Sequence, residues 1–382
     1  MPRPALRLAV ELDGDGAHPA AWRRAAHAPG DLLSPRRLAR SAAAAENAGF
    51  TLVTLDDSIL PPSSGADPVG RIGAVERAAF IAASTSVLGV APVLATTYAE
   101  PFHVSSQLSS LDHASAGRAG WVVSVEEDPA AARAWGRPLV EGSAALAREA
   151  HDGLRVVRDL WDSWEDDAVI RSVATSRYLD RERLHAIDFT GETYSVKGPS
   201  IVPRPPQGRP VVLARQGLVP AGLTDVALVG AATAAETGAA GEAARAAGAP
   251  LAFAEIEVAL DTPRESARDR IADLERYSPW EERPDRLRYT GSADGLVSLL
   301  AELAAQVDGV RLLPLVLDED LAVLSRLVLP ELFVRRLATR PLPGTTLRTS
   351  LGLSRPLSRF ASGTDTDSAT DTAAALVREE TR

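Results

Sequence analysis

The chain has 382 residues, of which 45% are hydrophobic and 24% charged, an ordinary composition for a globular protein with a sizeable core. Its 41 Lys and Arg residues against 51 Asp and Glu residues give a formal net charge of -10, which argues against a nucleic acid or an anionic membrane as the main partner because both need a basic surface. The absence of cysteine excludes disulfides, thiolate nucleophiles and thiolate metal sites.

The first ten residues contain two arginines and no continuous apolar segment, so they are not typical of a signal peptide. No uncharged apolar run approaches the length that spans a bilayer. From these two observations we expect a cytoplasmic protein with no membrane partner.

Short apolar runs alternate along the chain with longer Ala- and Arg-rich segments at helical spacing, which is typical of repeated βα units. In the first unit, Ser34 is predicted to cap a helix that has Pro35 at its first position and ends at Gly49. Further helices are predicted from near residue 101 and over 143–161, 231–247, 264–276 and 293–305. The eight predicted strands cover residues 6–12, 51–55, 87–94, 119–125, 210–214, 225–229, 251–258 and 309–316.

Eight strands that alternate with helices favour a parallel (β/α)8 TIM barrel. A doubly wound open sheet is the alternative, but no G-x-G-x-x-G follows the first predicted strand. Residues 162–209 are predicted to form a long irregular insertion after strand four. We expect one barrel domain over residues 1–357 and a disordered tail over 358–382, where Ser, Thr, Asp and Ala dominate and large apolar side chains are almost absent.

Polar pairs follow several of the predicted strands, at the point where each strand ends. Because the carboxyl ends of parallel barrel strands meet at one face, these pairs indicate a polar ligand site above an apolar barrel. The alternative is that strand ends are polar only because they meet water. In chain order the pairs are Asp56 and Asp57, Thr96 and Thr97, Glu126 and Glu127, and Arg215 and Gln216.

Other catalytic patterns are missing from the sequence. No two of the six histidines stand at the i, i+2 or i, i+4 spacing that presents two ligands to one metal ion, so we predict no metal site. No G-x-S-x-G elbow supports a serine hydrolase. Asp56 and Asp57 are adjacent in a strand and therefore point to opposite faces, which keeps them from sharing one proton easily. The residue patterns alone nominate no catalytic residue.

Several longer strings resemble one branch of a known family. They are Glu100-Pro101-Phe102-His103, Leu111-Asp112-His113, Gly117-Arg118-Ala119-Gly120-Trp121, Leu160-Trp161-Asp162-Ser163-Trp164, Pro203-Arg204-Pro205-Pro206-Gln207-Gly208-Arg209-Pro210, Gly344-Thr345-Thr346-Leu347-Arg348 and Leu351-Gly352-Leu353-Ser354-Arg355-Pro356. On these strings the chain is identified as a member of the luciferase-like flavin-dependent monooxygenases, in the branch of the nitrilotriacetate, EDTA and dibenzothiophene-sulfone monooxygenases. The resemblance extends in order over roughly residues 5 to 356.

This resemblance implies a luciferase-like (β/α)8 barrel, in agreement with the strand count. It also implies an oxidoreductase that takes reduced FMN from a separate flavin reductase and uses dioxygen to oxygenate a small organic substrate, with the cofactor carrying the chemistry. Family members commonly form homo-oligomers, which we therefore expect here.

The family's cofactor contacts carry over to a few positions of this chain. Asp57 falls on a flavin-contacting aspartate of the family, and Thr96 or Thr97 on a threonine. Arg215 stands in the loop that holds the flavin phosphate in the family, where its guanidinium is a candidate clamp for that phosphate.

Two functions remain open from the sequence. The first is an FMN-dependent monooxygenase with a remodelled pocket. The second is a flavin-poor, non-catalytic family member that acts as a binding or partner subunit. A deazaflavin coenzyme, used by other luciferase-like branches, is a third variant. The second function is suggested by the residues that replace usual flavin contacts, namely Val122, Ser143, Ala147 and Val219.

Overall fold

Eight parallel strands close on themselves in the computed structural model, which describes residues 5–60, 70–281 and 283–361. Around the barrel the order is β10-β9-β4-β3-β2-β1-β13-β11, and a pairing between β10 and β11 closes the ring. All eight predicted strands are confirmed, within two residues at each end. They are β1 (Arg7–Glu11), β2 (Leu52–Leu55), β3 (Gly89–Ala95), β4 (Gly120–Ser124), β9 (Val211–Arg215), β10 (Val226–Val229), β11 (Leu251–Leu260) and β13 (Gly309–Pro314).

A ninth parallel strand, β12 (Leu287–Gly291), was not predicted. It pairs with residues 256–260 at the carboxyl half of β11, whereas the first half of β11 pairs with β10. The barrel wall is therefore extended at its carboxyl end, where the candidate site lies.

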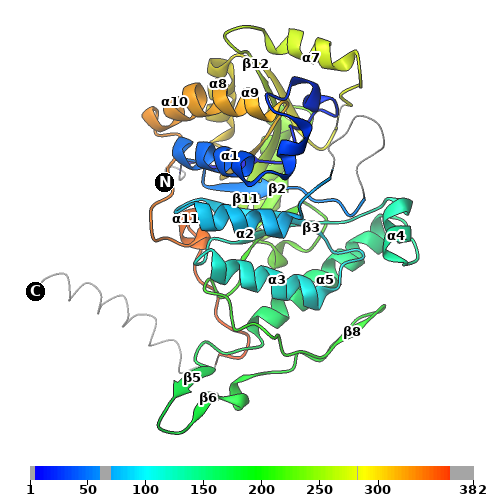
Figure 1. The fold of residues 1–382 in the computed structure, drawn as a ribbon, viewed down its shortest axis with the longest axis vertical. Coiled ribbons are helices and arrows are strands. Elements are labelled where there is room, and N and C mark those ends of the chain that lie inside the picture. Colours follow the sequence, from blue (N-terminus) through cyan, green and yellow to red (C-terminus); the bar gives the residue numbers. More distant parts are fainter. Residues whose placement is uncertain (1–4, 61–69, 282, 362–382) are drawn as a thin grey trace, which may run out of the picture.

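Helices cover the outside of the barrel (Figure 1). The predicted α1 is confirmed in detail, because Ser34 Oγ accepts the N–H of Arg36 at 3.3 Å and Gly49 ends the helix with φ 98°. No helix in the described part of the chain is long and apolar enough to cross a membrane. The helices are α1 (Pro35–Ala48), α2 (Ala74–Ser84), α3 (Pro101–Ala114), α4 (Pro129–Trp135), α5 (Ser143–Asp162), α6 (Ala234–Ala246), α7 (Ala267–Glu275), α8 (Ala293–Leu303), α9 (Leu317–Val323), α10 (Leu329–Val334) and α11 (Leu347–Leu351).

Helix α2 shows why some elements were not predicted. Gly73 stands at its N-cap and has no side chain to accept a hydrogen bond. The cap comes instead from Asp57 at the end of β2, whose Oδ2 accepts the N–H of Ala74 at 2.9 Å. No local sequence pattern can reveal a cap that the fold supplies from seventeen residues away.

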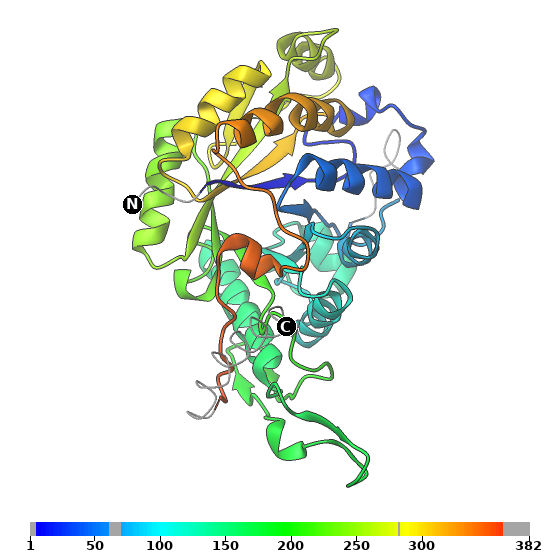
Figure 2. The same cartoon turned by 90° about the vertical axis from the view of Figure 1, so that its left-hand side faces the viewer.

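The insertion after β4 is more regular than predicted. After α4 and α5 it contains two small antiparallel hairpins, one between β5 (Val169–Ser172) and β6 (Arg177–Leu179) and one between β7 (Phe189–Thr190) and β8 (Ser195–Val196). In both views the hairpins extend from the barrel at the end away from α7 (Figure 1, Figure 2).

The boundary of the predicted tail needs a correction at residues 358–361. Ser358 is buried and its hydroxyl donates to the carbonyl of Asp162 at 3.3 Å. The ring of Phe360 stacks on His185 with centroids 4.1 Å apart. These residues therefore belong to the folded domain, and the rest of the predicted tail, residues 362–382, lies outside the described residues.

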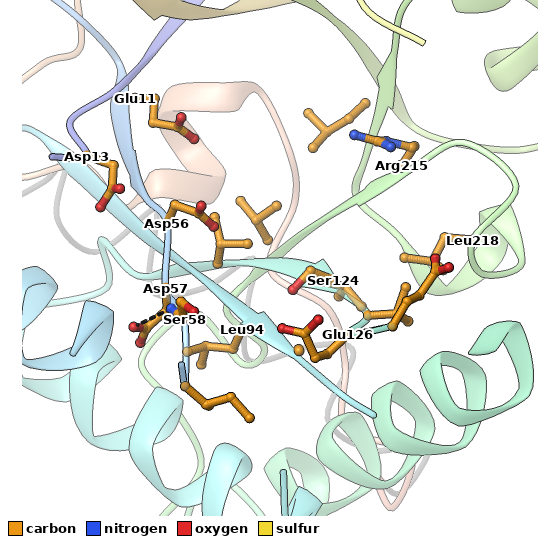
Figure 3. Close-up of a pocket in the computed structure, with 18 of the residues that line it drawn as sticks. Glu11, Asp13, Asp56, Asp57, Ser58, Leu94, Ser124, Glu126, Arg215 and Leu218 are labelled. Carbon is orange, nitrogen blue, oxygen red and sulfur yellow. Dashed lines mark hydrogen bonds between the residues drawn. The ribbon is translucent and has the colours of Figure 1, made fainter. Parts of the chain in front are cut away.

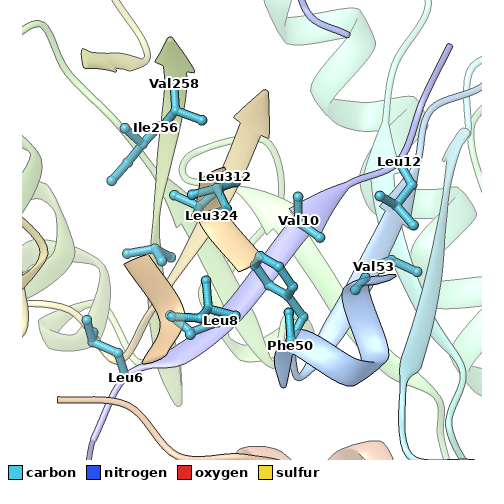
Figure 4. Packing of buried hydrophobic residues seen from close by; sticks show 14 of the residues in the cluster. Leu6, Leu8, Val10, Leu12, Phe50, Val53, Ile256, Val258, Leu312 and Leu324 are labelled. Atoms are coloured by element: carbon cyan, nitrogen blue, oxygen red, sulfur yellow. The ribbon is translucent and has the colours of Figure 1, made fainter. Parts of the chain in front are cut away.

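The alternation of side chains along the strands divides apolar residues between two cores. On β1, Leu8 and Val10 point outward and pack with Leu312 and Leu324 against the covering helices (Figure 4). Ala9 points inward and joins the apolar interior of the barrel. Both faces of these strands are thus buried, which explains why they are visible in the sequence as short apolar runs.

Helix α11 closes the amino-terminal end of the barrel. Leu347 packs against β3 so tightly that a Cβ on Gly89 would lie 2.7 Å from the Leu347 Cδ1 atom. The guanidinium of Arg348 contacts both carboxylate oxygens of Asp225, at 2.9 and 2.8 Å, and both residues are buried. A second buried contact joins the amide of Gln207 to Asp112 Oδ1 at 2.6 Å. Most of the strings that carry the family resemblance thus meet at this closed end, where residues stabilise the fold.

Candidate active site

The carboxyl ends of the barrel strands surround a cavity of about 1350 Å³. Ligand sites in (β/α)8 barrels lie at this end, and a typical small-molecule site occupies roughly 300–1,000 Å³. Figure 3 shows Glu11, Asp56 and Asp57 on one side of the cavity, with Arg215 and Leu218 on the opposite side. The cavity can therefore hold more than one small molecule.

One wall of the cavity is apolar. Val93 of β3 pairs with Val122 of β4, and both belong to the apolar interior of the barrel together with Leu228 of β10. Leu94 and Leu218 also line the cavity. Val122, at a position where the resemblance implies a polar flavin contact, is thus part of an apolar surface. Such a wall can bury a flat aromatic ring and exclude water from it.

The opposite wall carries a buried ion cluster centred on Arg311 of β13. Its guanidinium contacts the carboxylates of Glu11 and Glu255, and its Nε donates to the hydroxyl of Thr54 at 3.0 Å. The Arg311 side chain is only 5% exposed and that of Glu255 only 2%. Burial opposes the ionisation of Glu255, but Arg311 together with Arg286 outweighs it and holds the pKa of this carboxyl below its ordinary value.

Glu11 lies in the same cluster and behaves differently. Burial raises its pKa from 4.5 to about 7, because the attraction of Arg311 offsets only part of the desolvation and the charges of Asp56 and Asp13 add to it. A carboxyl that titrates near neutral pH inside a cavity is a candidate general acid or base.

Glu11, Glu255, Glu257 and Arg311 were not singled out as site residues by the sequence analysis, although a signal for them exists. Glu255 and Glu257 interrupt the apolar run of β11 two residues apart, so both must point to the same face. Arg311 likewise stands alone within the apolar run of β13. Charged residues inside a buried strand predict a polar barrel interior.

The two predicted aspartates both line the cavity but have different surroundings. The Asp57 carboxylate accepts the N–H groups of Ser58 and Ala74, each at 2.9 Å, and is therefore fixed at the start of α2. The carboxylate of Asp56 accepts a backbone hydrogen bond from Asp57, and the backbone carbonyl of Asp56 is bound by Arg77. The two carboxylates thus face different neighbours, as the strand alternation suggests.

The two predicted threonines do not line the cavity. Thr96 Oγ1 donates to the carbonyl of Ser124 at 3.3 Å, and Thr97 Oγ1 accepts the N–H of Glu126 at 2.9 Å. Both side chains are buried. These hydrogen bonds hold the backbone at the end of β4, from which Glu126 points into the cavity (Figure 3).

Arg215 lines the cavity but is already paired. Its guanidinium forms an ion pair with Asp285 and lies 3.7 Å from Glu255. The loop between β9 and β10 contains only a three-residue 3-10 turn, Ala221–Leu223, and no α-helix. Val219 is buried in an apolar cluster, and Ser143 and Ala147 on α5 do not line the cavity.

The cavity as a whole is strongly acidic, since eleven carboxylates and four arginines line it. Within the described residues, no group of three or more His, Asp or Glu side chains is arranged to hold a metal ion.

Replacing Glu11→Gln should change how stability depends on pH. Because the folded-state pKa of Glu11 is raised, its stabilising contribution is complete below about pH 4.5 and is lost as pH rises through about 7. The difference in free energy of unfolding, variant minus unsubstituted protein, should therefore increase by about 3 kcal/mol as the pH rises between these limits. Urea denaturation at several pH values measures this difference.

The matched control is Glu302→Gln, which makes the same change on the exposed face of α8. Its stability should follow the unsubstituted protein at every pH. Parallel curves for Glu11→Gln and the unsubstituted protein from pH 4 to pH 8 would show that Glu11 ionises normally.

Comparisons with known proteins point to one family. A family model described as luciferase-like monooxygenase matches residues 16–297. N-acetyl-S-(2-succino)cysteine monooxygenase of Bacillus subtilis is 36% identical over 211 residues, which cover 54% of this chain and 47% of that protein. Nitrilotriacetate monooxygenase component A of Aminobacter aminovorans is 33% identical over 222 residues, covering 54% and 49%.

Among solved structures, EDTA monooxygenase from a Chelativorans species superposes with a TM-score of 0.77 at 22% identity, over 92% of this chain and 99% of that chain. This likeness confirms the barrel fold. By sequence, the chain spans about half the length of the curated relatives that it matches.

Proposed function

The chain belongs to the luciferase-like monooxygenase family, and from this premise we propose that its cavity binds a reduced flavin from a separate reductase and, with dioxygen, oxygenates a small organic substrate. The division of the cavity into an apolar wall and a charged wall is the observation that supports the proposal most directly. A reduced flavin supplies the reaction of dioxygen with the substrate, and the protein supplies binding, orientation and exclusion of water.

The cavity residues have distinct parts in this proposal. The apolar wall around Val93 and Val122 buries the flavin ring and keeps water away from it. Glu11 holds or releases a proton at its carboxylate near neutral pH. Asp57, at the rim, is the acidic residue proposed to contact the flavin.

Thr96, Thr97 and Arg215 complete the proposed flavin surroundings. The threonines act through the backbone of residues 124–126, which their hydroxyls hold in place. Arg215 would have to leave Asp285 and Glu255 before it could bind a phosphate.

The flavin ring and the phosphate of FMN differ in how well they suit these residues. The ring fits the apolar wall. The phosphate of FMN does not fit, because a phosphate site combines hydroxyl donors, which Ser58, Ser124 and Ser278 provide in this lining, with cations or a helix N-terminus. Around this cavity each described arginine already faces a carboxylate, and the loop after β9 begins no helix.

The partners in this proposal are a flavin reductase and a second copy of the chain. The relative from Aminobacter is named as component A, which supports a separate second component for that protein. We propose the same division of labour here, and a homo-oligomer as the state of the enzyme.

The proposal is tested by anaerobic titration of the purified protein with reduced flavin, followed by oxygen consumption with a reductase. We expect saturable binding, with a dissociation constant in the micromolar range or below, and a change in the absorbance of the reduced flavin on burial in the cavity. Absence of binding by any reduced flavin at high micromolar concentration would exclude a flavin enzyme.

A second candidate function is that of a flavin-free partner subunit. It is favoured by one observation, the acidic lining of the cavity, which opposes any anionic coenzyme. In that case a related flavin-binding chain would be stabilised by this one, while this chain alone would bind neither reduced nor oxidised flavin.

A further inference from the structure

We infer that this cavity takes a flavin with an uncharged ribityl tail, namely riboflavin, in preference to FMN. The inference rests on the proposed function, since it concerns which flavin binds to the proposed site. The two flavins differ only in a terminal phosphate, which carries close to two negative charges at pH 7. Their relative affinity therefore reports the charge around the end of the tail.

The arginines of the cavity all lie near carboxylates, so a phosphate would compete with these carboxylates for each cation. Arg311 contacts Glu11 and Glu255. Arg286 lies 3.6 Å from Glu257, and Arg215 is paired with the carboxylate of Asp285. The fourth arginine of the lining, at position 283, shares the carboxylate of Asp285, at 3.6 Å. Each of these cations therefore lies beside at least one carboxylate, although the buried Nε of Arg286 has no hydrogen-bond partner among the described residues.

Several carboxylates of the cavity, in contrast, lack a cation. Among the described residues, no arginine forms an ion pair with Glu100, Glu126 or Glu127, and all three line the cavity. Glu126 is also held in place, because its Oε1 accepts the N–H of Asp128 at 3.0 Å (Figure 3). A phosphate in this part of the cavity would meet negative charge in a partly desolvated site, where repulsion is poorly screened.

Helix N-termini do not offer an alternative site for the phosphate. The N–H of Ala74 at the start of α2 is bound to Asp57, and the N–H of Ala130 at the start of α4 is bound to Asp128 at 2.7 Å. Helix α3 has Glu100 at its N-cap position; the side chain of Glu100 makes no capping hydrogen bond but places a negative charge at this helix N-terminus. A phosphate would therefore have to displace a carboxylate at the start of α2 or α4, and would meet the charge of Glu100 at the start of α3.

A neutral tail, in contrast, suits the same surroundings. The terminal hydroxyl of riboflavin is a hydrogen-bond donor, and a carboxylate acceptor such as Glu126 or Glu127 would bind it through a charge-assisted hydrogen bond. The acidic lining thus favours riboflavin by attraction as well as excluding FMN by repulsion.

The test is anaerobic titration of the full chain with riboflavin and with FMN, each reduced, at pH 7.5 and low ionic strength. We expect riboflavin to bind at least about tenfold more tightly, a difference of about 1.4 kcal/mol. Raising the salt to about 0.5 M should narrow the ratio, because screening weakens the repulsion between phosphate and carboxylates. Equal affinities, or tighter binding of FMN, would overturn the inference and leave the proposed function intact.

Two variants locate the effect. In Glu126→Gln/Glu127→Gln, the affinity for FMN should rise at least about threefold, because its phosphate no longer meets these charges. The affinity for riboflavin should fall, because its terminal hydroxyl loses a charge-assisted acceptor. The control Glu302→Gln, outside the cavity, should change neither affinity.

Arg215→Ala should weaken the binding of both flavins equally or not at all. A selective loss of FMN affinity would show that Arg215 clamps the phosphate and would overturn the inference. If neither flavin binds, the inference fails together with the proposed function.

Discussion

Replacing Arg311→Met is expected to lower the free energy of unfolding by about 3–5 kcal/mol at pH 7. The guanidinium neutralises Glu11 and Glu255 inside the barrel, and methionine fills a similar volume without the charge. Glu255 would then be left with Arg215 at 3.7 Å and Arg286 at 3.9 Å as its only cations among the described residues. Urea denaturation measures the loss, which is a large fraction of the 5–15 kcal/mol that is typical of a folded domain.

Two further measurements identify the cause of that loss. Adding Glu255→Gln to Arg311→Met should recover part of the stability, because it removes one of the two carboxylates that lost their cation. Arg283→Met, which removes an arginine that is 48% exposed, should cost no more than about 1 kcal/mol. A loss below about 1 kcal/mol in Arg311→Met would mean that water already solvates the cluster.

The second large effect is expected at the closed end of the barrel, where Arg348→Met should also cost about 3–5 kcal/mol. The Asp225 carboxylate would lose both hydrogen bonds from the guanidinium and keep one from the N–H of Val212, at 2.9 Å. The carbonyl of Arg209 would lose the Nε donor of Arg348 at 2.7 Å. Thermal denaturation and hydrogen exchange at α11 measure the effect, because helix α11 is tied to the barrel through this residue.

Arg335→Met is the matched control for this prediction. Its ion pair with Glu331 is an exposed i, i+4 contact, with side chains 48% and 38% exposed, so the substitution should cost less than about 0.5 kcal/mol. Similar losses in Arg335→Met and Arg348→Met would contradict the structural role of the buried pair.

The family resemblance predicts the closed end of the barrel better than the cofactor positions. Most strings that identify the family contribute residues such as Asp112, Gln207 and Arg348, which hold the amino-terminal end of the barrel closed. That end of the fold is under packing constraints that are independent of the ligand. The resemblance therefore predicts the barrel well, while the residues of the cavity differ from the family pattern and decide which flavin can bind.

Much of the fold could be predicted from the order of residues alone. Apolar residues at every second position fix which side of β1 faces the helices, and the local caps of α1 lie within a few residues of its ends. Patterns of this kind depend on short-range geometry, so they can be seen in the sequence.

The charges and ion pairs of the cavity, in contrast, depend on the tertiary structure. Asp57 caps α2, Arg215 pairs with Asp285 seventy residues later in the chain, and Arg311 meets Glu11 from the far end of the sequence. Whether an arginine is free to bind a phosphate depends on such long-range partners, and the pKa of Glu11 depends on how deeply the closed barrel buries it. The sequence by itself determined the barrel and its family, whereas the charge of the site arises only when distant strands are brought together.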